Sequence, residues 1–184
     1  MEDKLRNLTF IVVFGFIIMA ILIIGLYFRD GSTNSTTTGS SSSDSSTTEY
    51  DVSAMNEVDA DEALALFEEE GTHVLYIGRS TCSACIQFVP QLNQVQEDLG
   101  FTTNYLDVQE YMGDWSRAQE ELGPLMELIT IEATANGETG ELGELFIDRG
   151  YTPVLIVIQD GEVVEGFFGN RSASELTSIL EEYL

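Results

Sequence analysis

The chain contains only two cysteines, Cys82 and Cys85, and their spacing places the two thiols one helical turn apart. The pair follows a short apolar run at 74–77 and precedes a helical pattern that extends to about Leu99. The pattern therefore predicts a buried strand followed directly by a helix, with the cysteines at the junction. Two thiols in such a position are typical of a dithiol that opens and closes during disulfide exchange.

The junction predicts different chemistry for the two thiols. The N-terminus of a helix carries unpaired N–H groups and partial positive charge, which favour a thiolate at Cys82. Arg79 lies three residues earlier and adds positive charge, so we expect the pKa of Cys82 to lie below its usual range. Cys85 falls one turn later, is expected to be less exposed, and can attack a mixed disulfide formed on Cys82. The sequence therefore predicts that Cys82 attacks the substrate and that Cys85 resolves the mixed disulfide.

A structural disulfide or a metal site would use the same two cysteines. A bridge that closes so short a loop constrains the unfolded chain little and therefore stabilises little. Two thiolates supply half of a tetrahedral zinc site. The chain has no second cysteine pair, and its single histidine, His73, is expected on the far side of the preceding strand. We therefore expect no metal and no cofactor.

The N-terminal region predicts a membrane anchor. Residues 8–28 form a run of 21 residues without a charge, which as a helix spans roughly 30 Å, the thickness of a bilayer core. Lys4 and Arg6 precede this run, which favours a cytoplasmic N-terminus. The run is longer than the apolar part of a signal peptide, and no cleavage pattern follows it. Residues 1–30 are therefore predicted to be a cytoplasmic tip and a single transmembrane helix in the cell membrane.

The rest of the chain is predicted to be a tether and one domain outside the cytoplasm. Residues 31–49 are rich in Ser and Thr and have no apolar face to bury, which is typical of a disordered tether. Residues 50–184 are long enough for a single core. From Glu49 onward there are 28 acidic residues against four arginines. This balance excludes nucleic acid as an expected partner and predicts a solvated acidic surface.

Residue patterning over 50–184 predicts an α/β domain with a mixed sheet. The segment 74–108 predicts a strand–helix–strand unit with parallel strands, and Asp160-Gly161 predicts an antiparallel hairpin. Helices are expected over 59–70 and 82–99, and from Ser172 or Ser174 to the C-terminus. Strands are expected over 74–77, 102–108, 154–159 and 162–168.

Several motifs together resemble thioredoxin. Cys82 and Cys85 are followed by Pro90 inside the expected helix, and a later segment carries Thr152-Pro153 before a strand and the Asp-Gly hairpin. Over roughly residues 58–184 the chain is similar to the thioredoxin-like superfamily, which implies a three-layer fold. The resemblance implies that Pro153 is the family's cis-proline beside the two cysteines, where it presents backbone to an extended substrate. It also implies catalytic roles for Cys82, Cys85 and Pro153 and substrate contacts for Thr152, Thr81 and Arg79, with Thr152 tuning the redox pair.

The chain departs from the thioredoxin pattern at the site and in one long segment. Thr81 stands where thioredoxin has tryptophan, and Ser-Ala replaces Gly-Pro between the cysteines. Tyr76 stands where thioredoxin has a buried aspartate that helps proton transfer from the resolving cysteine. The segment 109–148 makes this chain longer than a minimal thioredoxin-like protein. We expect the segment to be mostly helical, with breaks at Gly123-Pro124 and Asn136-Gly137 and a loop over 137–143. We expect this insert to flank the active site and to contribute to the choice of partner.

The resemblance implies a membrane-anchored thiol–disulfide oxidoreductase that acts on extracytoplasmic proteins or peptides, where disulfides persist. The anchored build and the run Ile77–Cys82 are similar to bacteriocin-transport accessory proteins of Gram-positive bacteria. Oxidase, isomerase and reductase all remain open. A reductase would need a separate membrane redox partner, because the predicted anchor has no cysteine to carry electrons. The alternative is a non-catalytic thioredoxin-like module that docks onto a secretion or bacteriocin-export system.

Overall fold

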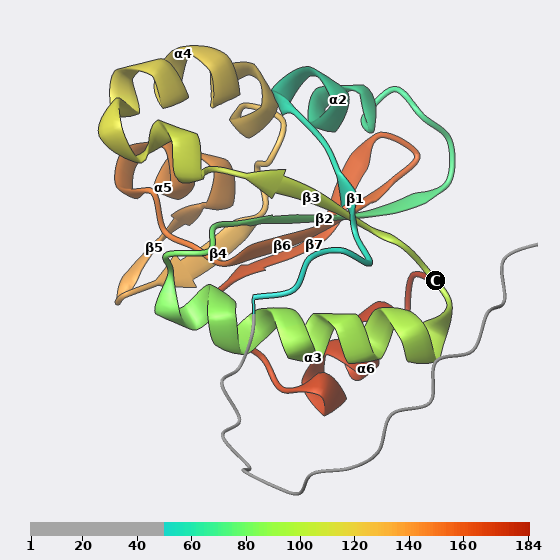
Figure 1. Cartoon of the computed structure of the whole chain (residues 1–184). Coiled ribbons are helices and arrows are strands. Elements are labelled where there is room, and N and C mark those ends of the chain that lie inside the picture. Colours follow the sequence, from blue (N-terminus) through green and yellow to red (C-terminus); the bar gives the residue numbers. More distant parts are fainter. Residues whose placement is uncertain (1–49) are drawn as a thin grey trace, which may run out of the picture. The chain divides into compact units, whose positions relative to one another are not determined.

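The computed structural model describes residues 50–184, and the predicted anchor and tether lie outside this range (Figure 1). No helix within residues 50–184 is long and apolar enough to cross a membrane. The elements in chain order are β1 (Asn56–Glu57), α2 (Ala60–Ala65), β2 (Thr72–Gly78), α3 (Ser83–Leu99), β3 (Thr103–Asp107), the 3₁₀ helix η1 (Gln109–Gly113), α4 (Trp115–Met126), β4 (Glu132–Ala135), β5 (Glu138–Glu141), α5 (Leu142–Arg149), β6 (Val154–Gln159), β7 (Glu162–Phe168) and α6 (Ala173–Leu180).

A five-stranded sheet in the order β1-β3-β2-β6-β7 forms the centre of the domain. β1, β3 and β2 are parallel, whereas β6 is antiparallel to both β2 and β7. This arrangement confirms the predicted mixed sheet, the parallel pairing of the strands around α3 and the hairpin at Asp160-Gly161. The short edge strand β1 was not predicted, because its two residues carry no strand pattern.

Helices cover both faces of the sheet, which confirms the three layers (Figure 1). α3 and α6 lie on one face, and α2, α4 and α5 lie on the other. Side chains of a strand alternate between faces, so Val74 and Tyr76 pack with the core under α3, while Leu75 and Ile77 pack with the core under α2 and α4. All four are buried because both faces are covered, and this explains the continuous apolar run of β2.

The prediction of a mostly helical insert over 109–148 is wrong in part. The insert contains η1, α4 and α5, but β4 and β5 form an antiparallel hairpin where a loop over 137–143 was expected. Asn136 and Gly137 have φ of 51° and 85°, the left-handed backbone of a tight two-residue hairpin turn. α4 also continues through Gly123-Pro124 to Met126. A proline close to the end of a helix removes only one of its last hydrogen bonds, and buried Leu122 and Leu125 hold this turn against the core.

Two other helices are shorter than predicted. The helix expected over 59–70 ends at Ala65, and the C-terminal helix ends at Leu180. Capping boxes at Asp59 and Ser172 start these helices, so the predicted cap at Ser172 is correct. Gly100, in the left-handed conformation, ends α3 as predicted.

Gly143 fixes the packing of α5 on the end of α4. A Cβ atom added at this position would lie 1.9 Å from the carbonyl oxygen of Met126. The backbone N–H of Gly143 donates to the carbonyl of Ile129 at 3.0 Å. The two backbones can approach this closely only because residue 143 has no side chain. This contact anchors the helix that leads into the Thr152-Pro153 segment.

Candidate active site

Cys82 is itself the N-cap of α3. Its Sγ accepts the backbone N–H of Cys85 at 3.2 Å, and helical backbone begins at Ser83. The sulfur thus replaces the side-chain oxygen that usually satisfies a free N–H at a helix start. This geometry holds the thiol of Cys82 against the positive end of the helix.

The two thiols differ in exposure and in acidity. Both are free; Cys82 is partly exposed, whereas Cys85 is fully buried. Burial raises the pKa of Cys82, but hydrogen bonds from the Cys85 thiol, Thr152 and the backbone N–H groups of Cys85 and Ala84 outweigh burial, so this pKa lies below its ordinary value. Burial, followed by the neighbouring Cys82, raises the pKa of Cys85 to about 11. The pair therefore combines an accessible thiol of lowered pKa with a buried thiol of raised pKa, an asymmetry that suits disulfide exchange.

Thr152 and Pro153 lie directly beside Cys82. The Thr152–Pro153 peptide bond is cis, the isomer that the resemblance implies. The thiol of Cys82 donates to the carbonyl oxygen of Thr152 at 3.5 Å, while Arg79 Nη1 donates to the hydroxyl of the same threonine at 3.2 Å. Arg79 is thus joined to Cys82 through Thr152. A direct effect of its charge on the pKa of Cys82 stays a prediction.

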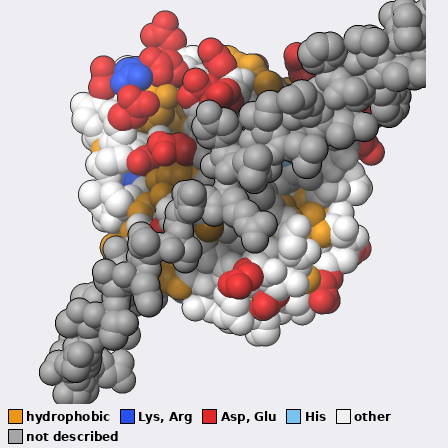
Figure 2. Space-filling model, turned by 45° about the vertical axis from the view of Figure 1, so that its right-hand side comes forward, with side chains coloured by type: hydrophobic (Ala, Val, Ile, Leu, Met, Phe, Trp, Pro, Cys, Tyr) orange, Lys and Arg blue, Asp and Glu red, His pale blue; other side chains and the backbone are white. Residues whose placement is uncertain are grey.

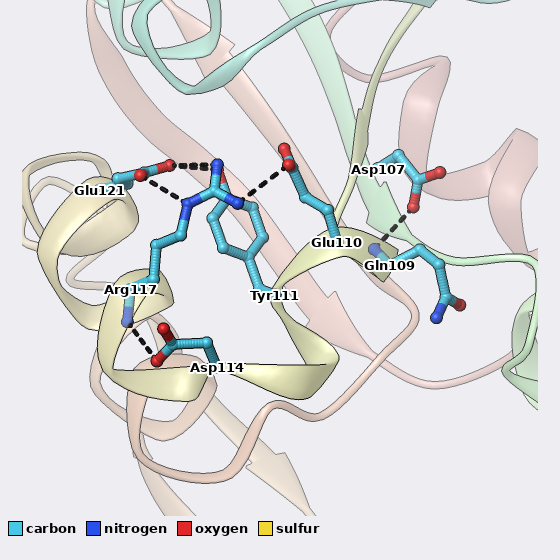
Figure 3. Close-up of polar contacts among 7 residues, drawn as sticks. All are labelled: Asp107, Gln109, Glu110, Tyr111, Asp114, Arg117 and Glu121. Carbon is cyan, nitrogen blue, oxygen red and sulfur yellow. Dashed lines mark hydrogen bonds and ion pairs between the residues drawn. The ribbon is translucent and has the colours of Figure 1, made fainter.

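Thr81 links the cysteine loop to the start of the insert. Its hydroxyl donates to the side-chain oxygen of Gln109 at 2.5 Å. The backbone N–H of Gln109 in turn donates to Asp107 at 2.8 Å, at the end of β3 (Figure 3). Thr81 itself is exposed. The contact places the first residue of η1 beside the cysteine loop, on the side of the site opposite to Thr152.

The insert therefore reaches the site from both of its ends. η1 begins at Gln109, next to Thr81, and α5 ends at Arg149, three residues before Thr152. Tyr151 packs edge-on against Phe168 of β7, and its hydroxyl donates to Glu138 of the insert's hairpin at 3.3 Å. This placement agrees with the predicted position of the insert, whereas its role in partner choice stays a prediction.

An ion-pair network stiffens the first part of the insert. Arg117 of α4 pairs with Glu121 at 2.7 Å and with Glu110 of η1 at 3.1 Å, and it lies over the ring of Tyr111 (Figure 3). Asp114 caps α4 through the N–H of Arg117. All these charges are exposed, so we expect the network to fix orientation more than to add stability.

A cluster of three tyrosines lies under the buried cysteine. Tyr76 of β2 stacks on Tyr105 of β3 with ring centroids 5.3 Å apart, and Tyr50 meets Tyr105 edge-on. The hydroxyl of Tyr50 lies 3.2 Å from that of Tyr76 and 2.8 Å from that of Tyr105. Sequence reasoning singled out Tyr76 alone. Tyr105 could have been found from its in-register pairing with Tyr76 across two parallel strands, but Tyr50 adjoins the tether and carries no such signal.

Acidic side chains far outnumber basic ones in the described domain. Figure 2 shows several groups of acidic side chains on the visible face outside the grey atoms, with few basic side chains among them. Despite this abundance, residues 50–184 contain no group of three or more His, Cys, Asp or Glu side chains arranged to hold a metal ion.

No protein-family model matches the chain, and no curated protein matches it. Among solved structures it is similar to Plasmodium falciparum thioredoxin, with 14% identity over 71% of this chain and 100% of that chain and a TM-score of 0.46. A chloroplastic thioredoxin z structure matches with 12% identity over 70% and 93% of the two chains and a TM-score of 0.45. A structure on thiol resolving in yeast mitochondrial 1-Cys peroxiredoxin matches with 11% identity over 71% and 96% and a TM-score of 0.46.

The architecture of residues 50–184 itself defines the class of fold. A mixed sheet in the order β1-β3-β2-β6-β7 lies between two layers of helices, with C-x-x-C at the start of α3 and a cis-proline before β6. The domain therefore has a thioredoxin-like α/β fold, enlarged by the insert between β3 and β6.

Proposed function

We propose that this chain is a membrane-anchored thiol–disulfide oxidoreductase that acts on extracytoplasmic proteins or peptides through Cys82 and Cys85. The observation that carries the proposal is the asymmetry of the pair: a partly exposed thiol of lowered pKa at a helix N-terminus, one turn from a buried thiol of raised pKa. The thiolate is the nucleophile in disulfide exchange, so this asymmetry assigns the attack to Cys82 and the resolving step to Cys85.

The neighbouring residues fit an extended substrate. Thr152 and Pro153 lie against Cys82, and Thr81 and Arg79 stand on either side of it in contact with Gln109 and Thr152. A substrate strand laid beside Pro153 would bring its disulfide to Cys82. In this proposal the insert, which reaches the site at Gln109 and at Thr152, contributes to the choice of substrate.

The proposed location rests on the sequence. The uncharged run at 8–28 and the polar segment at 31–49 favour an anchor and a tether, and a disulfide exchanger is useful where disulfides persist. The run Ile77–Cys82 further favours a role beside a peptide-export system in a Gram-positive bacterium. Protease added to intact cells should remove the thioredoxin-like domain while leaving a cytoplasmic marker whole; a protected domain would contradict the location.

Turnover by the detergent-solubilised full-length chain tests the activity. We expect it to catalyse oxidation of a reduced, unfolded protein or reduction of a protein disulfide, and Cys82→Ser to abolish this. Cys85→Ser should instead accumulate a mixed disulfide on Cys82, because the resolving thiol is missing. If the full-length chain shows no turnover in either direction and Cys82→Ser leaves the cellular phenotype unchanged, the non-catalytic docking module is the correct function.

A further inference from the structure

Cys85 poses a problem that the dithiol alone does not solve. Its thiol is fully buried, and its pKa is raised to about 11 by burial and by Cys82. In the resolving step, however, it must lose its proton before its sulfur can attack the mixed disulfide on Cys82. Water does not reach the buried thiol, so the proton needs a path through the protein.

The tyrosine cluster under α3 offers a path away from Cys85. Tyr76 is a close neighbour of Cys85, and its hydroxyl lies 3.2 Å from the hydroxyl of Tyr50. Tyr50 donates to Tyr105 at 2.8 Å, so the proton between Tyr76 and Tyr50 belongs to Tyr76. The side chain of Asp107, which is partly exposed at the end of β3, is a close neighbour of Tyr105. The two hydrogen bonds run in one direction, from Tyr76 through Tyr50 to Tyr105, with the buried sulfur at one end and the partly exposed carboxyl group at the other.

The backbone leaves room for this path at one critical point. A Cβ atom added at Gly78 would lie 2.1 Å from the Tyr76 hydroxyl oxygen. Any side chain at residue 78 would therefore displace the hydroxyl from its place between Cys85 and Tyr50. Because Gly78 has no side chain, the space beside it can hold the hydroxyl end of Tyr76.

None of the three tyrosines is suited to remain ionised. Burial, followed by the neighbouring Cys85, raises the pKa of Tyr76 above its ordinary value. Burial likewise raises the pKa of Tyr105, and it raises that of Tyr50 to about 12. A phenol that resists ionisation can still pass a proton on, because each hydroxyl accepts one proton as it gives up another.

We propose that Tyr76, Tyr50 and Tyr105 form a proton relay that carries the proton of Cys85 to Asp107 during the resolving step. This inference rests on the proposed thiol–disulfide function. The Cys85 sulfur forms a bond to Cys82 as the bond between Cys82 and the substrate sulfur breaks. The substrate leaves as a thiolate, which takes a proton from water. Over the two exchanges the dithiol loses two electrons and the substrate disulfide gains them.

The proton itself moves by one bond at each step. Cys85 gives its proton to Tyr76, and the protons of Tyr76, Tyr50 and Tyr105 each shift to the next oxygen until one reaches the Asp107 carboxylate and then water. The new O–H of Tyr76 points back at the sulfur and stabilises the thiolate through a charge-assisted hydrogen bond. Tyr76 touches a reacting atom and is a catalytic residue of this step, whereas Tyr50 and Tyr105 act through it.

Stopped-flow reaction of the reduced, detergent-solubilised full-length chain with excess dithiobis(nitrobenzoate) separates the two thiols. The first thionitrobenzoate is released when Cys82 attacks, at a rate that rises with reagent concentration. The second is released when Cys85 resolves the mixed disulfide, at a rate independent of that concentration. General acid–base assistance is commonly worth 10²–10⁴-fold, so we expect Tyr76→Phe and Tyr50→Phe each to slow the second phase by at least about tenfold and to leave the first unchanged.

The pH profile separates a relay from a purely electrostatic effect. Tyr76→Phe removes the donor to the Cys85 thiolate, so the second phase should also shift to higher pH. Tyr50→Phe keeps that donor, so its second phase should be slower at every pH with the same midpoint. Tyr183→Phe is the matched control, because its hydroxyl meets the carbonyl of Val164 away from the relay, and both phases should be unchanged.

Two results would overturn the inference in distinguishable ways. A normal second phase in Tyr50→Phe would refute the relay while leaving the dithiol function intact. The absence of any second phase in the unaltered chain would refute the proposed function, and the relay with it.

Discussion

The hydroxyl of Thr152 is expected to control how much of Cys82 is thiolate. It is one of the groups that lower the pKa of Cys82 against the effect of burial, and Arg79 holds it in place at 3.2 Å. A hydrogen bond to a charged group contributes roughly 1.5–3 kcal/mol. Because Cys82 is partly exposed, solvent screening reduces this to about 1 kcal/mol. Since 1.4 kcal/mol is a factor of ten, Thr152→Val should leave about fivefold less thiolate at a pH below the Cys82 pKa.

The rate of alkylation by iodoacetamide, measured against pH in a Cys85→Ser background, reports this change at Cys82 alone. A less acidic thiol is also a stronger nucleophile once ionised, with a Brønsted slope of about 0.4–0.5. The rate should therefore fall by roughly 2.5-fold at low pH and rise by roughly twofold at high pH, so that the two profiles cross. Thr152→Ser keeps the hydroxyl and should follow the unaltered profile. Profiles for Thr152→Val and Thr152→Ser that coincide would refute the assignment.

Two further predictions concern the stability of the domain, measured by urea unfolding of the full-length chain in detergent. Gly143→Ala places a methyl group 1.9 Å from the Met126 carbonyl oxygen and should lower the free energy of unfolding by about 3 kcal/mol. Gly123→Ala, in open space on α4, should instead raise it by up to about 1 kcal/mol. Equal effects of the two substitutions would contradict the packing of α5 on α4. Asp59→Ala removes the side-chain acceptor of the α2 capping box and should cost about 1 kcal/mol, while Asp59→Asn retains a cap oxygen and should cost clearly less. No difference between them would argue against the cap.

The sequence predicted the sheet and its central βαβ unit because these depend on strong local signals. The apolar run of β2, the helical pattern after Cys82 and the Asp160-Gly161 turn each determine one element almost alone. The Asn136-Gly137 turn carries the same kind of signal, but each flanking strand contains a single threonine among Glu, Gly and Ala, which are poor strand formers. Their pairing is stabilised by packing of β4 near β7 and by Gly143 at the start of α5, which no local pattern reveals.

Those residues of the site that lie in one short segment could be predicted from the sequence. Those that come together from distant segments could be predicted less well. Cys82, Cys85 and Arg79 lie within seven residues, and the polarity of a helix predicts which thiol is acidic. Tyr50 and Tyr105 lie far from the cysteines in sequence and reach Cys85 only through the pairing of β2 with β3. Gln109 meets Thr81 for the same reason, because both follow the ends of adjacent parallel strands.

A redox titration of the full-length chain in glutathione buffers, followed by acid quenching and alkylation, tests whether Cys82 and Cys85 form a redox-active pair. We expect one reversible two-electron transition that links Cys82 to Cys85. Because stabilising the Cys82 thiolate stabilises the reduced form, we expect a reduction potential above about −270 mV, the value for thioredoxin. Cysteines that stay reduced in oxidised glutathione, or that become glutathionylated independently without forming an intramolecular disulfide, would contradict it.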